Sequence, residues 1–236
     1  MSALTAGALA AEPGAVEPAP DSTTRPVAEI ANRPSKGFTY ARMRDGHSVA
    51  VSRRPGGRPY KRLPAYTEMG SRRHLAVVRV RPDWVAVAPT MKRNGHSVWI
   101  RRDDVNITFV RTMYSVRVDL SRRQLALKDG TRVIRRLPVA IGRPGSSTPT
   151  GRFAVTDKLN GFSLSSYYGC CVLALNGHQP NLPAGWSGGN RLAIHGTSDP
   201  GSIGTAASAG CVRARDRDLR VLMRLLPPGA PVFIRH

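Results

Sequence analysis

Short alternating runs dominate the pattern of apolar and polar positions along this chain. From about Ile107 onward, YSVRVDL, QLALKDG and TRVIRRLPVAIG alternate apolar and polar side chains, as β-strands with one buried face do. Further apolar runs, at GRFAVTDK, CCVLALNG, RLAIHGT and PVFIRH, predict more strands. The Asp129-Gly130 pair lies between two alternating runs and is a hairpin signal. The pattern therefore predicts a mainly β domain over residues 107–236.

One segment follows a helical period instead. In DLRVLMRLL, Leu219, Leu222 and Leu226 fall on one face of a helix, so the segment is predicted to be a short amphipathic helix. Pro227 and Pro228 follow directly and should end it.

An earlier segment, residues 37–106, predicts a second and smaller β domain. It contains the short apolar runs HSVAVSR, HLAVVRVR, WVAVAP and SVWIRR, with a hairpin signal at Asn94-Gly95. The size suggests an SH3-like barrel. Tyr40, Trp84 and Trp99 are expected in its core, because a small domain needs its large aromatics for packing. The alternative is that some of them stack on a ligand.

Residues 1–36 are rich in Ala, Pro, Glu, Ser and Thr and predict a disordered tail or linker. The first residues contain a small-residue stretch but lack the basic start and the apolar core of a signal peptide. A truncated export signal and a flexible tail both fit this composition. No run of about 18 apolar residues predicts a membrane span.

The charge of the chain is large and uneven. The formal net charge is +21, with −3 on residues 1–30 and +24 on the rest. Such a field attracts polyanions, among them an anionic cell wall. The alternative is a basic composition with no dedicated partner. No helix-turn-helix, RNP or zinc-finger pattern supports nucleic acid as that partner.

The three cysteines are too few for a disulfide-stapled scaffold. Cys170 and Cys171 begin an apolar strand and are expected to be structural, with a vicinal disulfide as the less favoured alternative. Cys211 and His195 have no second ligand pair beside them, so the spacing does not favour zinc. We expect neither a metal nor an organic cofactor.

The segment AIHGTSDPGSIGTAASAGCVR, residues 193–213, combines the residue types of a thiol-dependent acyl-transfer site. His195 ends an apolar strand, and the small residues around Ser208 and Gly210 leave backbone N–H groups free before Cys211. A neighbouring imidazole can take the thiol proton, and the resulting ion pair can lower the thiol pKa to about 3.5–7.5. Read alone, Cys211 and His195 fit equally well as a small buried hydrophobe and a structural histidine.

Several motifs together resemble the YkuD-type L,D-transpeptidase catalytic domain. AIHGT and SAGCVR resemble its signature, STPTGRF at 147–153 resembles its TPxGxF segment, and YSVRVDLSRRQLALKDG and LPPGAPVFI resemble its first hairpin and last strand. The resemblance covers about residues 107–236. It implies a β-sandwich or barrel-like catalytic domain with one short helix. Residues 37–106 resemble, more weakly, the SH3-like modules that precede this domain in some bacterial proteins.

The resemblance also implies residue roles. Cys211 takes the place of the nucleophile and His195 that of its base, and the Gly196 carbonyl would orient the imidazole. Gly210 and Cys211 lie where backbone N–H groups would bind an oxyanion. Arg213 would hold the catalytic loop or contact substrate, with a surface arginine as the alternative.

Other residues near this motif carry weaker expectations. Ser208 belongs to the loop that supports Cys211. Ala209 stands where many family members have histidine, which puts the rate in doubt more than the mechanism. Trp186 is expected either in a lid over the substrate cleft or in the core. His178 is expected as an exposed loop histidine rather than a cleft residue.

The activity implied by the resemblance is peptidoglycan L,D-transpeptidation, in which donor and acceptor stem peptides become joined by 3→3 cross-links through a cysteine thioester. Carbapenem-type β-lactams would be covalent inhibitors, and the setting would be bacterial and extracytoplasmic. Two alternatives stay open: an L,D-carboxypeptidase that uses water as acceptor, and a catalytically inactive basic protein that binds the cell wall.

Overall fold

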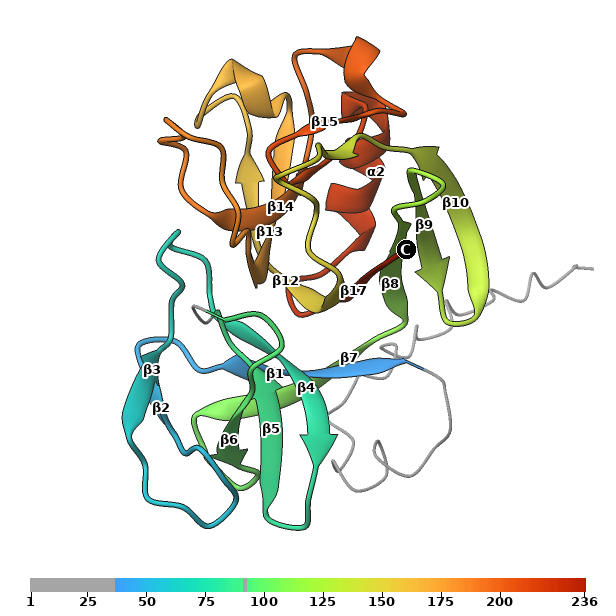
Figure 1. The fold of residues 1–236 in the computed structure, drawn as a ribbon. Helices are drawn as coiled ribbons and strands as arrows, with labels where there is room; N and C mark the ends of the chain where they lie inside the picture. The colour runs from blue at the N-terminus through green and yellow to red at the C-terminus, as the bar shows by residue number, and fades with distance from the viewer. Residues whose placement is uncertain (1–36, 91–92) are drawn as a thin grey trace, which may run out of the picture.

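A computed structural model describes residues 37–90 and 93–236. They form two β units stacked end to end, with the C-terminal unit above the N-terminal one in the view of Figure 1. The predicted 1–36 tail lies outside the described residues. Within the described residues, no helix is both long and apolar enough to cross a membrane.

The N-terminal unit is a five-stranded antiparallel sheet with a separate hairpin. The sheet order is β6-β5-β4-β1-β7, and β2 pairs with β3. The strands are β1 (Phe38–Met43), β2 (Ser48–Val51), β3 (Lys61–Pro64), β4 (His74–Val80), β5 (Trp84–Ala88), β6 (Val98–Arg101) and β7 (Ile107–Thr112). Tyr40 and Trp99 are buried as expected, but Tyr40 packs beside Gly229 of the C-terminal unit, and Trp84 is half-buried beside Arg101. The SH3-like assignment stays a prediction.

The boundary between the two units falls later than the sequence pattern indicates. β7 was expected to open the catalytic domain, but it pairs along its whole length with β1 of the N-terminal sheet. Most of β7 is only partly buried, so its own residue pattern does not indicate which sheet it joins, and the pairing with β1 places it in the N-terminal sheet. The C-terminal unit therefore starts at β8 (Tyr114–Asp119).

The C-terminal unit is a curved eight-stranded sheet that packs against a single described α-helix, so the mainly β prediction is confirmed (Figure 1). The sheet order is β10-β9-β8-β17-β12-β13-β14-β16. Its strands and helices are β8, β9 (Gln124–Asp129), β10 (Arg132–Pro138), β12 (Gly151–Asn160), β13 (Cys171–His178), β14 (Arg191–His195), β16 (Val212–Arg213), α2 (Asp216–Leu225) and β17 (Pro231–Arg235). A small parallel pair, β11 (Ile141–Gly142) and β15 (Ala206–Ser208), stands beside it, with 3₁₀ turns η1 (Ser166–Tyr168) and η2 (Pro200–Ser202).

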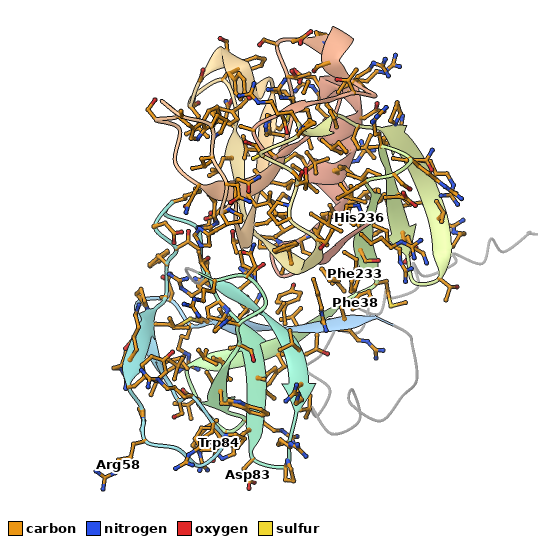
Figure 2. The ribbon with its side chains drawn as sticks, in the orientation of Figure 1. Phe38, Arg58, Asp83, Trp84, Phe233 and His236 are labelled. Carbon is orange, nitrogen blue, oxygen red and sulfur yellow. A yellow bond between two sulfur atoms is a disulfide. The ribbon has the colours of Figure 1, made fainter. Side chains whose placement is uncertain are left out.

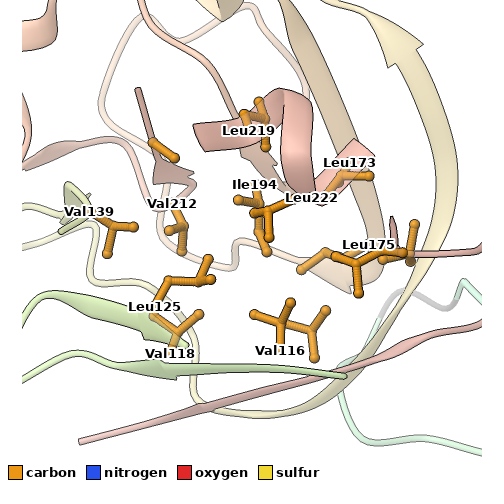
Figure 3. Close-up of a cluster of buried hydrophobic side chains, with 14 of the residues drawn as sticks. Val116, Val118, Leu125, Val139, Leu173, Leu175, Ile194, Val212, Leu219 and Leu222 are labelled. Atoms are coloured by element: carbon orange, nitrogen blue, oxygen red, sulfur yellow. The ribbon is translucent and has the colours of Figure 1, made fainter. Parts of the chain in front are cut away.

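The apolar face of α2 closes the core of this unit. Leu219 and Leu222 are fully buried against Ile194 of β14 and the side chains of β8 and β9, as Figure 3 shows. Each such leucine contributes about 1.5–3 kcal/mol by leaving water. The helix thereby fixes the segment from Cys211 to Asp216, which leads directly into it.

The two units contact each other through side chains of both sheets. Phe38 of β1 and Phe233 of β17 face each other across the junction, with ring centroids 5.8 Å apart (Figure 2). Asn176 of β13 donates to the Ala88 carbonyl of β5 at 3.0 Å. Arg152 of β12 donates to the Val77 carbonyl of β4 at 3.0 Å. These contacts hold the N-terminal unit against three central strands of the C-terminal sheet, β17, β12 and β13.

Candidate active site

Strand pairing brings Cys211 and His195 to one cavity. β14 ends at His195, and β16, which begins one residue after Cys211, pairs with it in parallel, with His195 opposite Arg213. Both Cys211 and His195 line a narrow cavity of about 100 Å³, and Ala209 lines it too. Sixteen sequence positions separate the two side chains, so the sheet rather than the local chain juxtaposes them.

The imidazole of His195 is held by backbone and by aromatic rings. Its Nδ1 lies 2.6 Å from the Gly196 carbonyl oxygen, which can only accept, so Nδ1 carries the proton. The rings of Tyr168 and Tyr167 flank the imidazole at centroid distances of 5.0 and 5.8 Å. Nε2 is then left with a free lone pair, as a base for the thiol requires.

The site favours the neutral forms of both groups. Burial raises the pKa of the Cys211 thiol to about 11, against the lowering effects of an Ala193 backbone hydrogen bond and of Arg213. Burial lowers the pKa of His195 to about 4, although the Gly196 hydrogen bond opposes it, and Arg213 lowers it further. The expected low thiol pKa is therefore wrong for this structure, because desolvation penalises the ion pair more than its partners stabilise it.

The thiol is not yet engaged by its base. Cys211 is the free cysteine of the described residues, and its Sγ donates to the Arg191 carbonyl at 3.7 Å. No hydrogen bond links this Sγ to His195, two residues that the structure describes fully. Catalytic contacts of this kind commonly tighten only when substrate is bound.

The loop that carries Cys211 is clamped by one hydroxyl. The buried Ser208 Oγ donates to the Cys211 carbonyl at 2.6 Å and accepts the Gly210 N–H at 3.0 Å. The Gly210 amide is therefore already engaged, contrary to its expected oxyanion role. Among the described residues, the Cys211 N–H, on the nucleophile itself, has no hydrogen-bond partner and is a loop amide available to an oxyanion.

Gly210 must be glycine for two reasons. Its φ is +122°, and a Cβ there would lie 1.9 Å from the Gln179 Nε2. Gln179 is itself buried and donates to the Ser146 and Ser147 carbonyls at 3.1 and 2.9 Å. The loop containing the STPTGRF motif thus supports the cysteine loop through Gln179. No sequence pattern indicates this role, because a single glutamine after a strand belongs to no motif.

Arg213 is buried rather than on the surface. Its guanidinium lies 4.8 Å from the Tyr167 ring centroid and donates to the Tyr167 hydroxyl. Within the described part of the chain, no carboxylate lies within ion-pair distance of it, and its Nε has no partner. A desolvated cation beside the thiol and the imidazole opposes protonation of His195.

Trp186 lines the cavity and is not part of the core. Its ring packs against Tyr167 at a centroid distance of 6.3 Å, and its Nε1 donates to the Gly189 carbonyl at 2.7 Å. His178 is half-buried away from this cavity, where its backbone amide donates to Asn94 of the N-terminal unit. Trp186 thus belongs to the cleft wall, and His178 belongs to the junction of the two units.

A loop of the N-terminal unit completes the cleft. Met69, which lies between β3 and β4, lines the cavity. The neighbouring Glu68 pairs with Arg191, and Thr67 donates to the fully buried Asp157. Arg191 also donates to Thr156 at 2.9 Å, and its carbonyl oxygen accepts a hydrogen bond from the Cys211 thiol. This contact joins residues far apart in the chain, so no local sequence pattern indicates it.

Cys170 and Cys171 are joined by a disulfide, which corrects the expectation of reduced structural cysteines. Both are buried and belong to the core of the catalytic unit, so their structural role agrees with their burial. In the ranges 37–90 and 93–236, no group of three or more His, Cys, Asp or Glu side chains is arranged to hold a metal ion.

Known proteins are similar to this chain in sequence. Residues 113–234 match the sequence profile of the L,D-transpeptidase catalytic domain, YkuD. The YkuD proteins of Bacillus licheniformis and Bacillus subtilis are 32% and 30% identical to this chain over 128 and 123 residues. These alignments cover 51% and 52% of this chain but only 65% and 66% of the relatives, less than two thirds of their length.

Solved structures show a more distant likeness. An L,D-transpeptidase from Mycobacterium smegmatis has 16% identity and a TM-score of 0.42, covering 69% of this chain and 99% of its own. Bd1075 of Bdellovibrio bacteriovorus has 25% identity and a TM-score of 0.42, covering 52% of this chain and 48% of its own. The family assignment rests on the profile match, which spans more than half of the chain. This chain belongs to the family of L,D-transpeptidase catalytic domains of the YkuD type.

Proposed function

We propose that this protein is a cysteine-dependent peptidoglycan L,D-transpeptidase that forms 3→3 cross-links between stem peptides through a thioester on Cys211. One observation supports this most strongly. The free thiol and a histidine held in the Nδ1–H form line the same narrow cavity. That pairing is what nucleophilic acyl transfer requires.

The first half-reaction acylates the enzyme. Sγ of Cys211 attacks the carbonyl carbon of the amide after the third stem residue, while Nε2 of His195 takes the thiol proton. The Cys211 N–H stabilises the resulting oxyanion. The carbon–nitrogen bond then breaks, His195 returns the proton to the departing amine, and the terminal D-residue leaves as a thioester remains on Cys211.

The second half-reaction transfers the acyl group. The side-chain amine of a second stem attacks the thioester carbonyl and gives a proton to His195. The carbon–sulfur bond breaks, and the proton returns to the thiolate, so the enzyme is regenerated. With a pKa of about 4, His195 is unprotonated at neutral pH, so its Nε2 can accept a proton in both half-reactions.

The setting follows from the substrate. Stem peptides are cell-wall components, so we place the protein on the extracytoplasmic side of a bacterial envelope. The high positive charge suits an anionic wall. Carbapenem-type β-lactams, which are strained acyl donors, would acylate the same thiol.

Product analysis tests the proposal. Purified protein is incubated with tetrapeptide-stem fragments, with Cys211→Ala as the matched control, and the products are weighed by mass spectrometry. A dimer lacking one D-residue supports transpeptidation. Monomeric tripeptide alone would assign the protein as an L,D-carboxypeptidase. No conversion and no carbapenem adduct would leave an inactive wall-binding protein.

A further inference from the structure

Asp216 makes hydrogen bonds that helix capping does not explain. It is the first residue of α2, where a carboxylate interacts favourably with the helix dipole. Its two oxygens, however, accept from backbone amides outside the helix. Oδ2 lies 2.9 Å from the Cys170 nitrogen, and Oδ1 lies 3.3 Å from the Thr197 nitrogen. The carboxylate therefore bridges the segment before β13 and the segment after His195.

The Thr197 amide belongs to the peptide group whose carbonyl holds His195. Gly196 supplies the oxygen that accepts from the His195 Nδ1 at 2.6 Å, and Thr197 supplies the nitrogen that donates to Asp216. Because a peptide group is planar, its C=O and N–H point in fixed and opposite directions. Holding the N–H therefore aims the carbonyl at the imidazole.

Two glycines bring backbone into close contact with the Asp216 carboxylate. A Cβ on Gly196 would lie 2.2 Å from Asp216 Oδ1, and a Cβ on Gly169 would lie 2.3 Å from the same atom. Gly169 also has a φ of +59°. The backbone can approach the carboxylate this closely only because both residues lack a side chain. A carboxylate that backbone surrounds this closely is suited to orienting a peptide group.

We propose that Asp216 is a positioning residue that, through the Gly196–Thr197 peptide, holds His195 in the tautomer with its proton on Nδ1. This inference rests on the proposed role of His195 as the base. If the peptide rotates, the carbonyl no longer accepts from Nδ1. The proton can then move to Nε2, and that nitrogen loses the lone pair that takes the thiol proton.

The test compares three variants in the full chain. Asp216→Ala removes both acceptors, and Asp216→Asn retains one oxygen at the same place. Asp218→Asn is the matched control, because Asp218 is a buried acid of the same helix that pairs with Arg135 at 3.2 Å and makes no recorded contact with the Gly196–Thr197 peptide. Folding of each variant is checked by circular dichroism and thermal unfolding.

Two measurements follow. Nitrogen-15 NMR of the histidine rings, with His195 assigned from the His195→Ala spectrum, reports the tautomer. Single-turnover acylation and steady-state kinetics report kcat and KM. For Asp216→Ala we expect the Nε2–H form to appear and kcat at pH 7 to fall by about 10- to 100-fold, as for other supporting residues. KM should change by less than about twofold, and Asp216→Asn should recover at least about a third of kcat.

Several outcomes would overturn the inference. A folded Asp216→Ala protein that keeps the Nδ1–H tautomer refutes it, and so does an equal loss of kcat in Asp218→Asn. If Asp216→Ala does not fold, an Asp216→Asn protein with wild-type tautomer but lost kcat also refutes it. The tautomer is read without turnover, so failure of the proposed reaction would not hide failure of this inference.

Discussion

His195→Ala tests how the thiol is activated. In the structure the thiol has a pKa of about 11 and His195 a pKa of about 4, so neither group is charged at neutral pH. The thiolate would then make up only about one part in 10⁴ at pH 7. A wild-type enzyme that depends on a neutral imidazole should instead acylate at a nearly constant rate from about pH 5 to about pH 9.

The variant removes the proton acceptor and leaves only the thiolate route. At pH 7 its acylation rate should be lower by about 10²–10⁴-fold, the usual contribution of a general base. The rate should then rise about tenfold per pH unit, because the thiolate fraction does, and the deficit should shrink to less than about tenfold near pH 11.

The assay is single-turnover acylation by a stem tetrapeptide across this pH range, followed by mass spectrometry of the intact protein. The thiol pKa of the variant is measured in parallel from the ultraviolet absorbance of the thiolate. That control detects any change of pKa caused by water entering the vacated space. Parallel pH profiles for wild type and variant would show that His195 does not activate Cys211, and the reasoning would fail.

Four further results are expected. Gly210→Ala should lower the free energy of unfolding by about 1–3 kcal/mol and slow acylation at least 100-fold, since a φ of +122° strains any residue with a side chain and the Cys211 amide must move. A wild-type acylation rate in a variant that calorimetry shows to be folded would contradict this. Met69→Ala should raise KM by roughly three- to tenfold with kcat unchanged, because each buried CH₂ is worth about 0.8 kcal/mol; an unaltered KM would remove the N-terminal loop from the substrate cleft. Cys170→Ala or Cys171→Ala, which removes the disulfide between them, should lower the free energy of unfolding while the folded protein stays active; loss of activity in a well-folded Cys171→Ala protein would contradict Cys211 as the nucleophile. Sedimentation with purified cell wall should weaken as salt rises from about 0.1 to about 1 M, since the screening length of exposed charges falls from about 10 to about 3 Å; indifference to salt would favour a basic composition without a dedicated partner.

Local sequence signals predicted the local structure well. The period of DLRVLMRLL gave α2, and the Asp129-Gly130 pair joins β9 to β10, where Gly130 has a φ of +56°. These features depend on neighbouring residues alone, so the sequence contains all the information that decides them. The same holds for the strand character of β8, β12 and β17.

Long-range features were not visible in the pattern. The parallel pairing of β14 with β16, which juxtaposes His195 and Arg213, links strands separated by a loop without any pattern. The contact of Glu68 with Arg191 spans 123 positions. The residue pattern of β7 likewise does not indicate which sheet the strand joins.

The electrostatics of the site were the most difficult to predict. A cysteine with a histidine in the same motif suggested a thiolate–imidazolium pair. The sequence shows which charged partners are present, but it does not show how strongly burial desolvates them. In the folded chain His195 is 1% exposed, and burial is the largest influence on both pKa values. The motif named the two reacting residues, while the packing around them sets their resting protonation.

Detection of the acyl-enzyme on Cys211 tests the central claim most directly. Wild-type protein and Cys211→Ala are mixed with a stem tetrapeptide, quenched in acid within the first turnover, digested and mapped by tandem mass spectrometry. We predict a tripeptidyl thioester on Cys211 in the wild type and no adduct in the variant, whose small loop tolerates alanine without loss of fold. A tripeptidyl adduct on any other residue, or cross-linked product from folded Cys211→Ala, would contradict the account.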